Sequence, residues 1–155
     1  MVCLGNICRS PMAAAVAGAM VQEAGLAGSV VIESFGTAGY HVGRPADRRA
    51  RAALRRAGWP AEGHCARRIT ADDVARADLV LVADRANRAE VVRLARNPAD
   101  RAKVRMLRSF DPDAGAGDAD VPDPWEGTDA DFDRALALIE AACRGLVAHL
   151  AGARP

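Results

Sequence analysis

The stretch Cys3-Leu4-Gly5-Asn6-Ile7-Cys8-Arg9-Ser10-Pro11 constrains this chain more than any other, because it runs directly into an expected helix over 11–23. Ser10 is a suitable N-cap for that helix, and Pro11 suits its first position. The N–H groups of the loop and the positive end of the helix dipole then converge on one point. The stretch, whose residues 3–10 we call the phosphate loop, therefore predicts a binding site for phosphate or a similar tetrahedral anion.

Each polar side chain of the phosphate loop has a chemical reason to be there. Helix N-termini and nearby cations favour the thiolate form of a cysteine, so Cys3 is the expected nucleophile. Arg9 carries a planar fork of donors that holds two phosphate oxygens at once, and Ser10 can donate a hydrogen bond to the sulfur. Gly5 is expected to adopt a conformation closed to other residues, and Asn6 a left-handed one.

The cysteines indicate a reduced protein without a metal site. Cys3 and Cys8 could instead be zinc ligands, but no second pair of cysteines or histidines at ligand spacing follows them. Together with Cys65 and Cys143 they lack the spacing of a disulfide framework, and no apolar stretch resembles a signal peptide or a membrane span. We therefore expect a cytoplasmic location.

Length and charge limit the architecture and the partners. The 155 residues fit one domain, residues 1–155, with a single sizeable core. The 21 basic and 20 acidic residues nearly cancel, so the composition predicts no general affinity for nucleic acid or membranes. The oligomeric state does not follow from the sequence.

Strand and helix patterns alternate along the chain. Strands are expected over 30–34, 78–83 and 103–107, and helices over 11–23, 45–57, 84–95 and 131–150, with a short helix that begins at a Thr70 capping box. This order predicts parallel βαβ units, that is, a three-layer α/β sheet with crossover helices. Because ligands sit at the carboxyl ends of such strands, the loops at 34–40, 84–87 and 109–128 should converge on Cys3.

The acidic loop at 109–128 contains the second chemical motif, Pro122-Asp123-Pro124-Trp125. A cysteine that attacks a phosphate ester has to expel an alkoxide or a phenoxide, and a general acid lowers that barrier. Asp123, stiffened by two prolines and beside an apolar Trp125, is the best candidate for that acid. An ordinary turn is the other interpretation of this Asp-Pro pair.

Together, the phosphate loop and Asp123-Pro124-Trp125 resemble the low-molecular-weight protein tyrosine phosphatase family, and the likeness runs from Cys3 to about Leu150. Several segments are most similar to actinobacterial members. The segments between the two motifs that carry the resemblance are Ser34, 36–43, 64–70, Asp84 with Asn87, and 105–112. The resemblance implies a four-stranded parallel sheet, no metal or organic cofactor, and a phosphotyrosine-containing protein as substrate, hydrolysed through a phosphocysteine intermediate.

The resemblance also implies a role for each matching residue. It makes Cys3 the nucleophile, Arg9 the clamp on the phosphate, and Asp123 the acid and then the base. The other implied site residues are Asn6, Ser10, Ser34 and His64 as a supporting hydrogen-bond network, Asp84 beside the rim, Leu4, Tyr40 and Trp125 as walls around the phosphorylated ring, and Gly5, Ile7 and Cys8 in the substrate-binding loop. Cys8 also matches a cysteine that can form a protective disulfide with Cys3; a small apolar packing residue is the other interpretation.

One departure from the family concerns the first strand, of which only Met1 and Val2 precede Cys3. Burial of about four further aliphatic side chains would contribute roughly 1.5 to 3 kcal/mol each, which rivals a typical stability of about 5 to 15 kcal/mol. We therefore expect a chain begun at Met1 to be unstable or weakly active, and an added upstream strand to rescue it.

Three alternative functions use the same residues. An arsenate reductase resembles this chain in fold and loop, but Cys65 and Cys143 lie in the wrong segments for its cysteine relay. A protein-arginine phosphatase has a small polar residue at the position of Ile7, which here favours an aromatic ester. A catalytically impaired phosphopeptide-binding protein is the third alternative, suggested by the short first strand although Cys3, Arg9 and Asp123 are all present.

Overall fold

A sheet of four short parallel strands organises the protein, in a computed structural model that describes residues 1–115, 117 and 119–152. The strands are β1 (Val2–Cys3), β2 (Phe35–Gly36), β3 (Val80–Val82) and β4 (Val104–Met106). Their order is β2-β1-β3-β4 and every pair is parallel, which confirms the expected sheet. β1 is therefore an inner strand, and Cys3 is its last residue.

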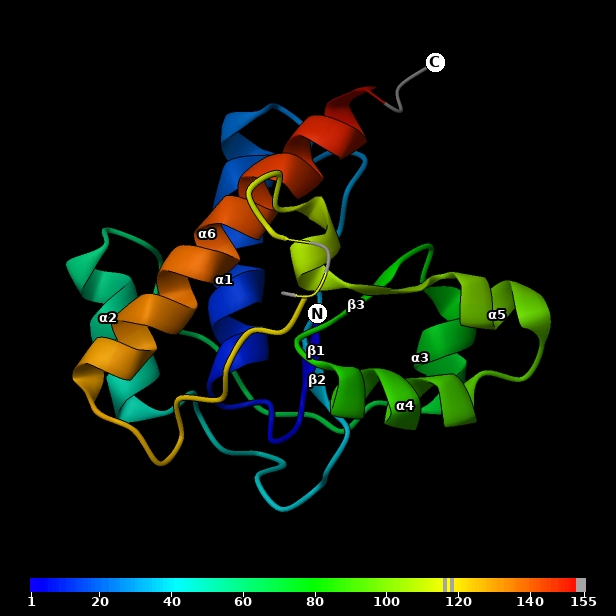
Figure 1. Ribbon diagram of the computed structural model, residues 1–155, viewed down its shortest axis with the longest axis horizontal. Coiled ribbons are helices and arrows are strands. Elements are labelled where there is room, and N and C mark those ends of the chain that lie inside the picture. The colour runs from blue at the N-terminus through cyan, green and yellow to red at the C-terminus, as the bar shows by residue number, and fades with distance from the viewer. Residues whose placement is uncertain (116, 118, 153–155) are drawn as a thin grey trace.

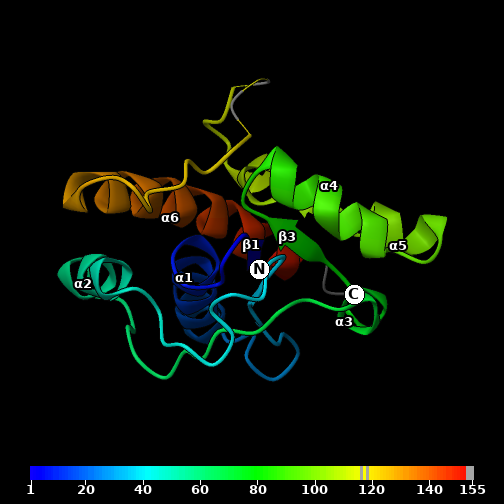
Figure 2. The same cartoon turned by 90° about the horizontal axis from the view of Figure 1, so that it is seen from below.

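Helices cover both faces of the sheet and make it the middle layer of three (Figure 1). The helices are α1 (Arg9–Glu23), α2 (Arg48–Arg56), α3 (Ala71–Arg76), α4 (Arg85–Leu94), α5 (Pro98–Ala102), the 3-10 helix η1 (Leu107–Phe110) and α6 (Asp129–Gly152). Figure 2 shows α1, α2 and α6 on one side of β1 and β3, with α3, α4 and α5 on the other side. The three-layer α/β arrangement is therefore as predicted.

Side chains that alternate along the strands feed two apolar cores. Val2, Val80 and Val82 point into the core beneath α3 and α4, where Val74 and Val91 are fully buried. Cys3 and Leu81 point into the larger core of α1, α2 and α6, whose fully buried members include Met12, Val16, Phe132 and Ile139. Successive side chains of a strand point to opposite faces of the sheet, and here both faces are covered by helices. The Cys3 side chain therefore lies on the face covered by α1, α2 and α6.

The expected strand over 30–34 is wrong. The second strand is only Phe35–Gly36, in register with Val2 and Cys3, and the residues before it have no strand partner among the described residues. Val31 is 85% exposed. The apolar run is real, but a strand needs a neighbour to pair with, and β1 offers only two residues.

A groove of about 490 Å³ lies where β1 would extend backwards between its two neighbours. Its walls are mainly apolar and come from residues 29–33 on one side and 76–81 on the other, with Leu146 and Leu150 of α6. The Met1 amino group, just before β1, donates to the Glu33 carbonyl oxygen at 2.7 Å. Burial lowers the pKa of that amino group from 8.0 to about 6.

Side-chain caps set where the helices begin, and the sequence predicted only some of these caps. The Thr70 capping box is confirmed, with Asp73 as its second member. The helix expected from residue 45 begins only at Arg48, because Asp47 is its N-cap and accepts from Arg49 N. Neither α5 nor η1 was expected.

α6 is long and apolar enough to span a membrane by length and composition alone. Its apolar stripe, from Phe132 to Leu146, is buried in the core with α1 and α2. The same length and composition are found in the core helix of a soluble protein, so α6 gives no independent indication of a membrane.

Candidate active site

The phosphate loop turns sharply at Asn6, which has a φ of 56° and is the residue expected to be left-handed. Gly5 is not in that region, contrary to expectation. A Cβ atom on Gly5 would instead lie 3.0 Å from Cδ2 of His41. Glycine at this position therefore makes room for a neighbouring ring rather than for an unusual backbone angle.

Ser10 does not cap the helix, so that prediction is wrong. α1 begins at Arg9, and its N-cap residue Cys8 makes no capping hydrogen bond. The Ser10 hydroxyl lies 3.0 Å from the Cys3 sulfur and 3.1 Å from the Phe35 carbonyl oxygen. A hydroxyl has one proton, so it can donate to the carbonyl beside a thiol and turn to the sulfur beside a thiolate.

The carbonyl groups of the phosphate loop face outwards and are bound by the surrounding scaffold. The Cys3 carbonyl accepts from Thr37 N and the Leu4 carbonyl from Ala38 N, both at 2.9 Å. The Asn6 carbonyl accepts from His64 Nε2 and the Ile7 carbonyl from Asp47 N, both at 2.7 Å. The N–H groups of residues 4–8 donate to no acceptor within the described part of the chain. A loop with bound carbonyls and unused N–H groups is a cradle for an anion.

The side chain of Asn6 holds the loop to three other segments. Its amide nitrogen donates to Ser10 Oγ at 2.8 Å and to Ser34 Oγ at 3.0 Å. Its amide oxygen accepts from Arg67 N at 2.7 Å. Burial lowers the pKa of His64, although its hydrogen bond to the Asn6 carbonyl opposes this. A neutral His64 must therefore carry its proton on Nε2 to donate to that carbonyl.

Arg9 is buried, 3% exposed, and two carboxylates hold its guanidinium. Nη1 donates to Asp84 Oδ2 and Nη2 to Asp123 Oδ2, both at 2.6 Å. Burial opposes the charge of Arg9, but the hydrogen bond to Asp84 and the charges of Asp123, Cys3 and Asp84 outweigh it and raise the pKa of Arg9. Nε is buried without a partner among the described residues, so its N–H group can donate to an anion.

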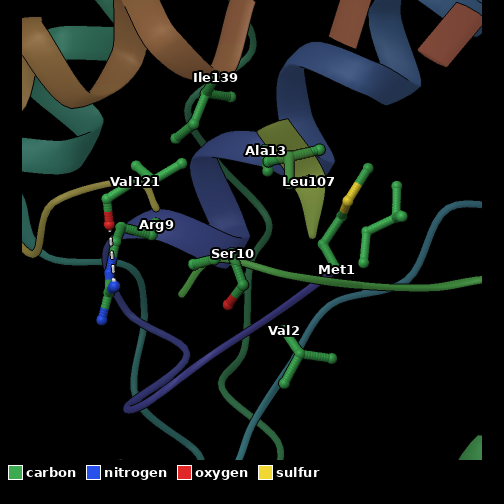
Figure 3. A pocket seen from close by; sticks show the side chains of 10 residues that line it. Met1, Val2, Arg9, Ser10, Ala13, Leu107, Val121 and Ile139 are labelled. Carbon is green, nitrogen blue, oxygen red and sulfur yellow. Dashed lines mark hydrogen bonds between the residues drawn. The ribbon is translucent and has the colours of Figure 1, made fainter. Parts of the chain in front are cut away.

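Backbone contacts bring the acidic loop to Arg9. Val121 N donates to the Ala83 carbonyl at the end of β3, at 2.8 Å. The Val121 carbonyl accepts from Arg9 Nη1 at 3.1 Å, the bond drawn in Figure 3. The carboxylate of Asp123 is 41% exposed, and its second oxygen accepts from Trp125 N at 3.2 Å. Asp123 thus reaches both solvent and the phosphate loop.

A cavity of about 10 Å³ lies behind the loop, among Met1, Ser10, Ala13 and Ile139 (Figure 3). This volume is about that of one water molecule. The cavity is too small for a phosphate ester, so substrate has to approach from the outer side of the phosphate loop.

The expected walls of the cleft are exposed apolar side chains. Leu4, Tyr40 and Trp125 are all exposed, at 43%, 72% and 44%. His41 joins two of them, because its ring centroid is 5.7 Å from that of Tyr40 and 5.7 Å from that of Trp125. Ile7 is buried, so of the substrate-binding set it can face a ligand mainly through its N–H group.

The other cysteines differ sharply in environment. Burial raises the pKa of Cys8, and it raises the pKa of Cys143 to about 12, so both remain thiols at neutral pH. Cys65 is exposed, and all four cysteines are free. Within the described residues, no three His, Cys, Asp or Glu side chains are arranged to hold a metal ion.

Three residues around the site were not predicted as site residues from the sequence: His41, Asp47 and Arg49. Asp47 N binds the loop through Ile7, and Arg49 donates to the carbonyls of Trp125 and Gly127. An Asp-x-Arg pair just after Pro45 could have signalled a helix cap. No local signal shows that the arginine reaches a segment 76 residues away in sequence.

Comparison with known proteins gives consistent names. A family model described as "Low molecular weight phosphotyrosine protein phosphatase" matches residues 1–154. A low molecular weight protein-tyrosine-phosphatase of Streptomyces coelicolor is 46% identical over 147 residues, covering 95% of this chain and 89% of that protein. Low molecular weight protein-tyrosine phosphatase A of Mycobacterium tuberculosis is 43% identical over 145 residues, covering 94% and 86%. Both relatives are actinobacterial, as the resemblance suggested.

A solved structure agrees with the fold. The protein tyrosine phosphatase from Entamoeba histolytica, with Hepes in its active site, superimposes with a TM-score of 0.91 at 30% identity, covering 97% of this chain and 94% of that one. Neither the names of these relatives nor this structure points to an arsenate reductase or a protein-arginine phosphatase.

Proposed function

Because the chain belongs to the low molecular weight phosphotyrosine protein phosphatase family, we propose that it hydrolyses phosphotyrosine in proteins through a phosphocysteine intermediate on Cys3. The tyrosine phosphatase activity follows from the family; the mechanism and the residue roles are our proposal. The observation that carries it is the meeting of Cys3, Arg9 and Asp123 at the N-terminus of α1.

Substrate binding uses the unpaired donors of the phosphate loop. The phosphate oxygens accept from the N–H groups of residues 4–8 and from Arg9, whose Nε has no partner in the described residues. In binding phosphate, the Arg9 guanidinium gives up part of its contact with Asp123. The carboxyl then lies beside a dianion, which favours its protonated form. Asp123 thereby becomes an acid when substrate is present.

In the first chemical step the Cys3 thiolate attacks phosphorus and the P–O bond to the tyrosine ring breaks. Asp123 gives its proton to the departing phenolic oxygen, so tyrosine leaves as a neutral phenol. The electron pair of the sulfur forms the S–P bond of phosphocysteine. Arg9 and the loop N–H groups stabilise the charge on the equatorial oxygens of the transition state.

In the second step water attacks the phosphocysteine. Asp123, now a carboxylate, takes one proton from that water, and the S–P bond breaks to release phosphate. Cys3 departs as a thiolate, and the Ser10 hydroxyl at 3.0 Å turns its proton from the Phe35 carbonyl to the sulfur. The enzyme then returns to its starting state without a cofactor.

The exposed rim selects the substrate. Leu4, Tyr40 and Trp125 offer apolar surface to the ring of phosphotyrosine, while Asn6, Ser34 and His64 keep the loop in shape beneath it. The substrates are phosphoproteins, and we propose that phosphotyrosine is the group recognised. The four free cysteines support a reducing compartment, the cytoplasm.

The test is release of phosphate from a phosphotyrosine peptide, with a phosphoarginine peptide and arsenate in parallel. We expect turnover of phosphotyrosine that Cys3→Ser abolishes and Asp123→Ala lowers by about 10²- to 10⁴-fold. Cys65→Ser, which changes an exposed cysteine, is the matched control and should keep full activity. Trapping of ³²P on the wild-type enzyme but not on Cys3→Ser would identify the intermediate.

Preferential turnover of phosphoarginine, or thiol-dependent reduction of arsenate, would replace the proposed substrate. Binding of the phosphotyrosine peptide without turnover would indicate the impaired, phosphopeptide-binding alternative.

A further inference from the structure

Arg49, in the first turn of α2, makes three contacts with the acidic loop and one with α6, although it has no part in the mechanism proposed above. Its Nη2 donates to the Trp125 carbonyl at 2.9 Å and its Nη1 to the Gly127 carbonyl at 3.1 Å. Its guanidinium carbon lies 5.6 Å from the ring centroid of Trp125 and 4.6 Å from that of Phe132. One planar group therefore holds two backbone carbonyls and two rings at once.

Asp47 ties this arginine to the phosphate loop. Asp47 Oδ1 accepts from Arg49 Nε at 3.2 Å and from Arg49 N at 2.7 Å, which also caps α2. Asp47 N donates to the Ile7 carbonyl at 2.7 Å. A continuous path of hydrogen bonds thus runs from the loop that binds phosphate to the segment that follows Asp123.

The segment from Pro122 to Gly127 needs such support because it has no helix or strand of its own. Before it, Val121 is fixed by Ala83 and Arg9; after it, the chain enters α6. Between these points, within the part of the chain that the structure describes, the donors from outside the segment to its backbone oxygens both belong to Arg49. Among the described residues, the hydrogen bonds that hold Asp123 are made by its side chain, which accepts from Arg9 Nη2 and from Trp125 N.

We propose that Arg49 is a positioning residue for the general acid: it holds the Trp125 and Gly127 carbonyls so that Asp123 stays within reach of the leaving oxygen. The fork of arginine is required, because lysine can donate to one of these carbonyls but has no planar group to span both and stack on the rings. This inference rests on the proposed role of Asp123.

A variant in which Asp123 is misplaced can be told from a variant whose fold is destabilised by how kcat/KM depends on the leaving group. When Asp123 protonates the leaving oxygen, the rate of P–O cleavage depends little on how acidic the leaving phenol is. Without that proton the phenoxide must leave charged, so poor leaving groups suffer most. The value of kcat/KM reports steps up to phosphoenzyme formation only, so it isolates this effect from hydrolysis of the intermediate.

The experiment measures kcat/KM for a series of aryl phosphates, from phenyl phosphate to 2,4-dinitrophenyl phosphate. We expect Arg49→Met to lower kcat/KM by about 10- to 100-fold for phenyl phosphate and by less than about 3-fold for the dinitrophenyl ester, as a partial version of a lost general acid. Arg49→Lys should fall between wild type and Arg49→Met. Arg48→Met, an exposed arginine one residue earlier on the same helix, is the matched control and should resemble wild type.

Asp123→Ala is measured beside these variants. If it steepens the dependence on the leaving group and Arg49→Met does not, or if Arg49→Met lowers all esters equally, the role of Arg49 is overturned while that of Asp123 stands. If Asp123→Ala leaves the dependence unchanged, both assignments fail, whereas loss of activity in Cys3→Ser would still support the nucleophile. Thermal unfolding of each variant shows whether a uniform loss comes from a destabilised fold.

Discussion

The two ends of β1 differ in how completely neighbouring segments bind and cover them. At its carboxyl end, the carbonyls of Cys3, Leu4, Asn6 and Ile7 are all bound by neighbouring segments. At its amino end, the Met1 amino group is buried beside a groove of about 490 Å³, and Val31 next to it is 85% exposed. The loops at the carboxyl end of β1 are therefore bound on several sides, whereas its amino end borders an open groove.

Arg9→Lys at the carboxyl end should have a larger effect than any change at the amino end. Lysine keeps the charge but lacks the fork that holds Asp84 and Asp123 and that offers Nε to phosphate. We expect kcat/KM for a phosphotyrosine peptide to fall by about 10²- to 10³-fold, the usual cost of one lost oxyanion donor. A loss of less than about 5-fold would mean that the fork is not essential, and urea unfolding would show whether the fold itself has changed.

Adding four aliphatic residues before Met1 should raise the free energy of unfolding. If these residues fill the groove as a longer β1, they pair with residues 29–33 and 78–80 and bury apolar surface that is now open. The expected gain in unfolding free energy is about 3 kcal/mol, after the ordering of the new residues is subtracted from their burial. Urea denaturation measures it, and a Gly-Ser-Gly-Ser extension is the control. Equal stability and activity for the extended and unextended chains would contradict our expectation about the first strand.

The buried amino group of Met1 should make stability depend on pH. Its pKa is lowered from 8.0 to about 6 in the folded protein, so between these values the unfolded chain binds more protons than the folded one. Stability therefore falls as pH falls, by about 2 kcal/mol from pH 8 to pH 6. Burial also lowers the pKa of His64 and adds a loss of the same sign. The extended chain has no amine in this place, so the difference between the two pH profiles isolates Met1; parallel profiles would exclude its contribution.

The smallest expected effect concerns the left-handed backbone of Asn6, in the loop at the carboxyl end of β1. Asn6→Ala and Asn6→Gly both remove the bonds to Ser10, Ser34 and Arg67, but only glycine accepts the φ of 56° without strain. We expect the alanine variant to be about 1 kcal/mol less stable than the glycine variant. Thermal unfolding compares them, and equal stabilities would show that the loop relaxes its backbone when the side chain is lost.

The phosphate loop was the part of the site that the sequence predicted best. The left-handed Asn6 was expected because asparagine tolerates that geometry, and the three-layer sheet followed from the alternation of strands and helices. Predictions from local sequence were wrong where the tertiary structure offers a residue a different hydrogen-bond partner or no strand partner. Ser10 is a good helix cap, yet its hydroxyl is used on Cys3 and Phe35 instead. Residues 30–34 have the composition of a strand, yet no strand pairs with them in the described part of the chain.

By itself, then, the sequence determined which chemical groups share one loop: the Cys3 that we propose as nucleophile, the Arg9 that we propose holds phosphate, and the start of the helix that follows them. Residues within one loop can express such chemistry, because covalent spacing already places them close together. Only the tertiary structure decided which carboxylates reach Arg9, and that Arg49 holds the carbonyls after Asp123. Those contacts join residues more than 70 positions apart, and only the packing of the sheet and helices brings such residues within hydrogen-bonding distance.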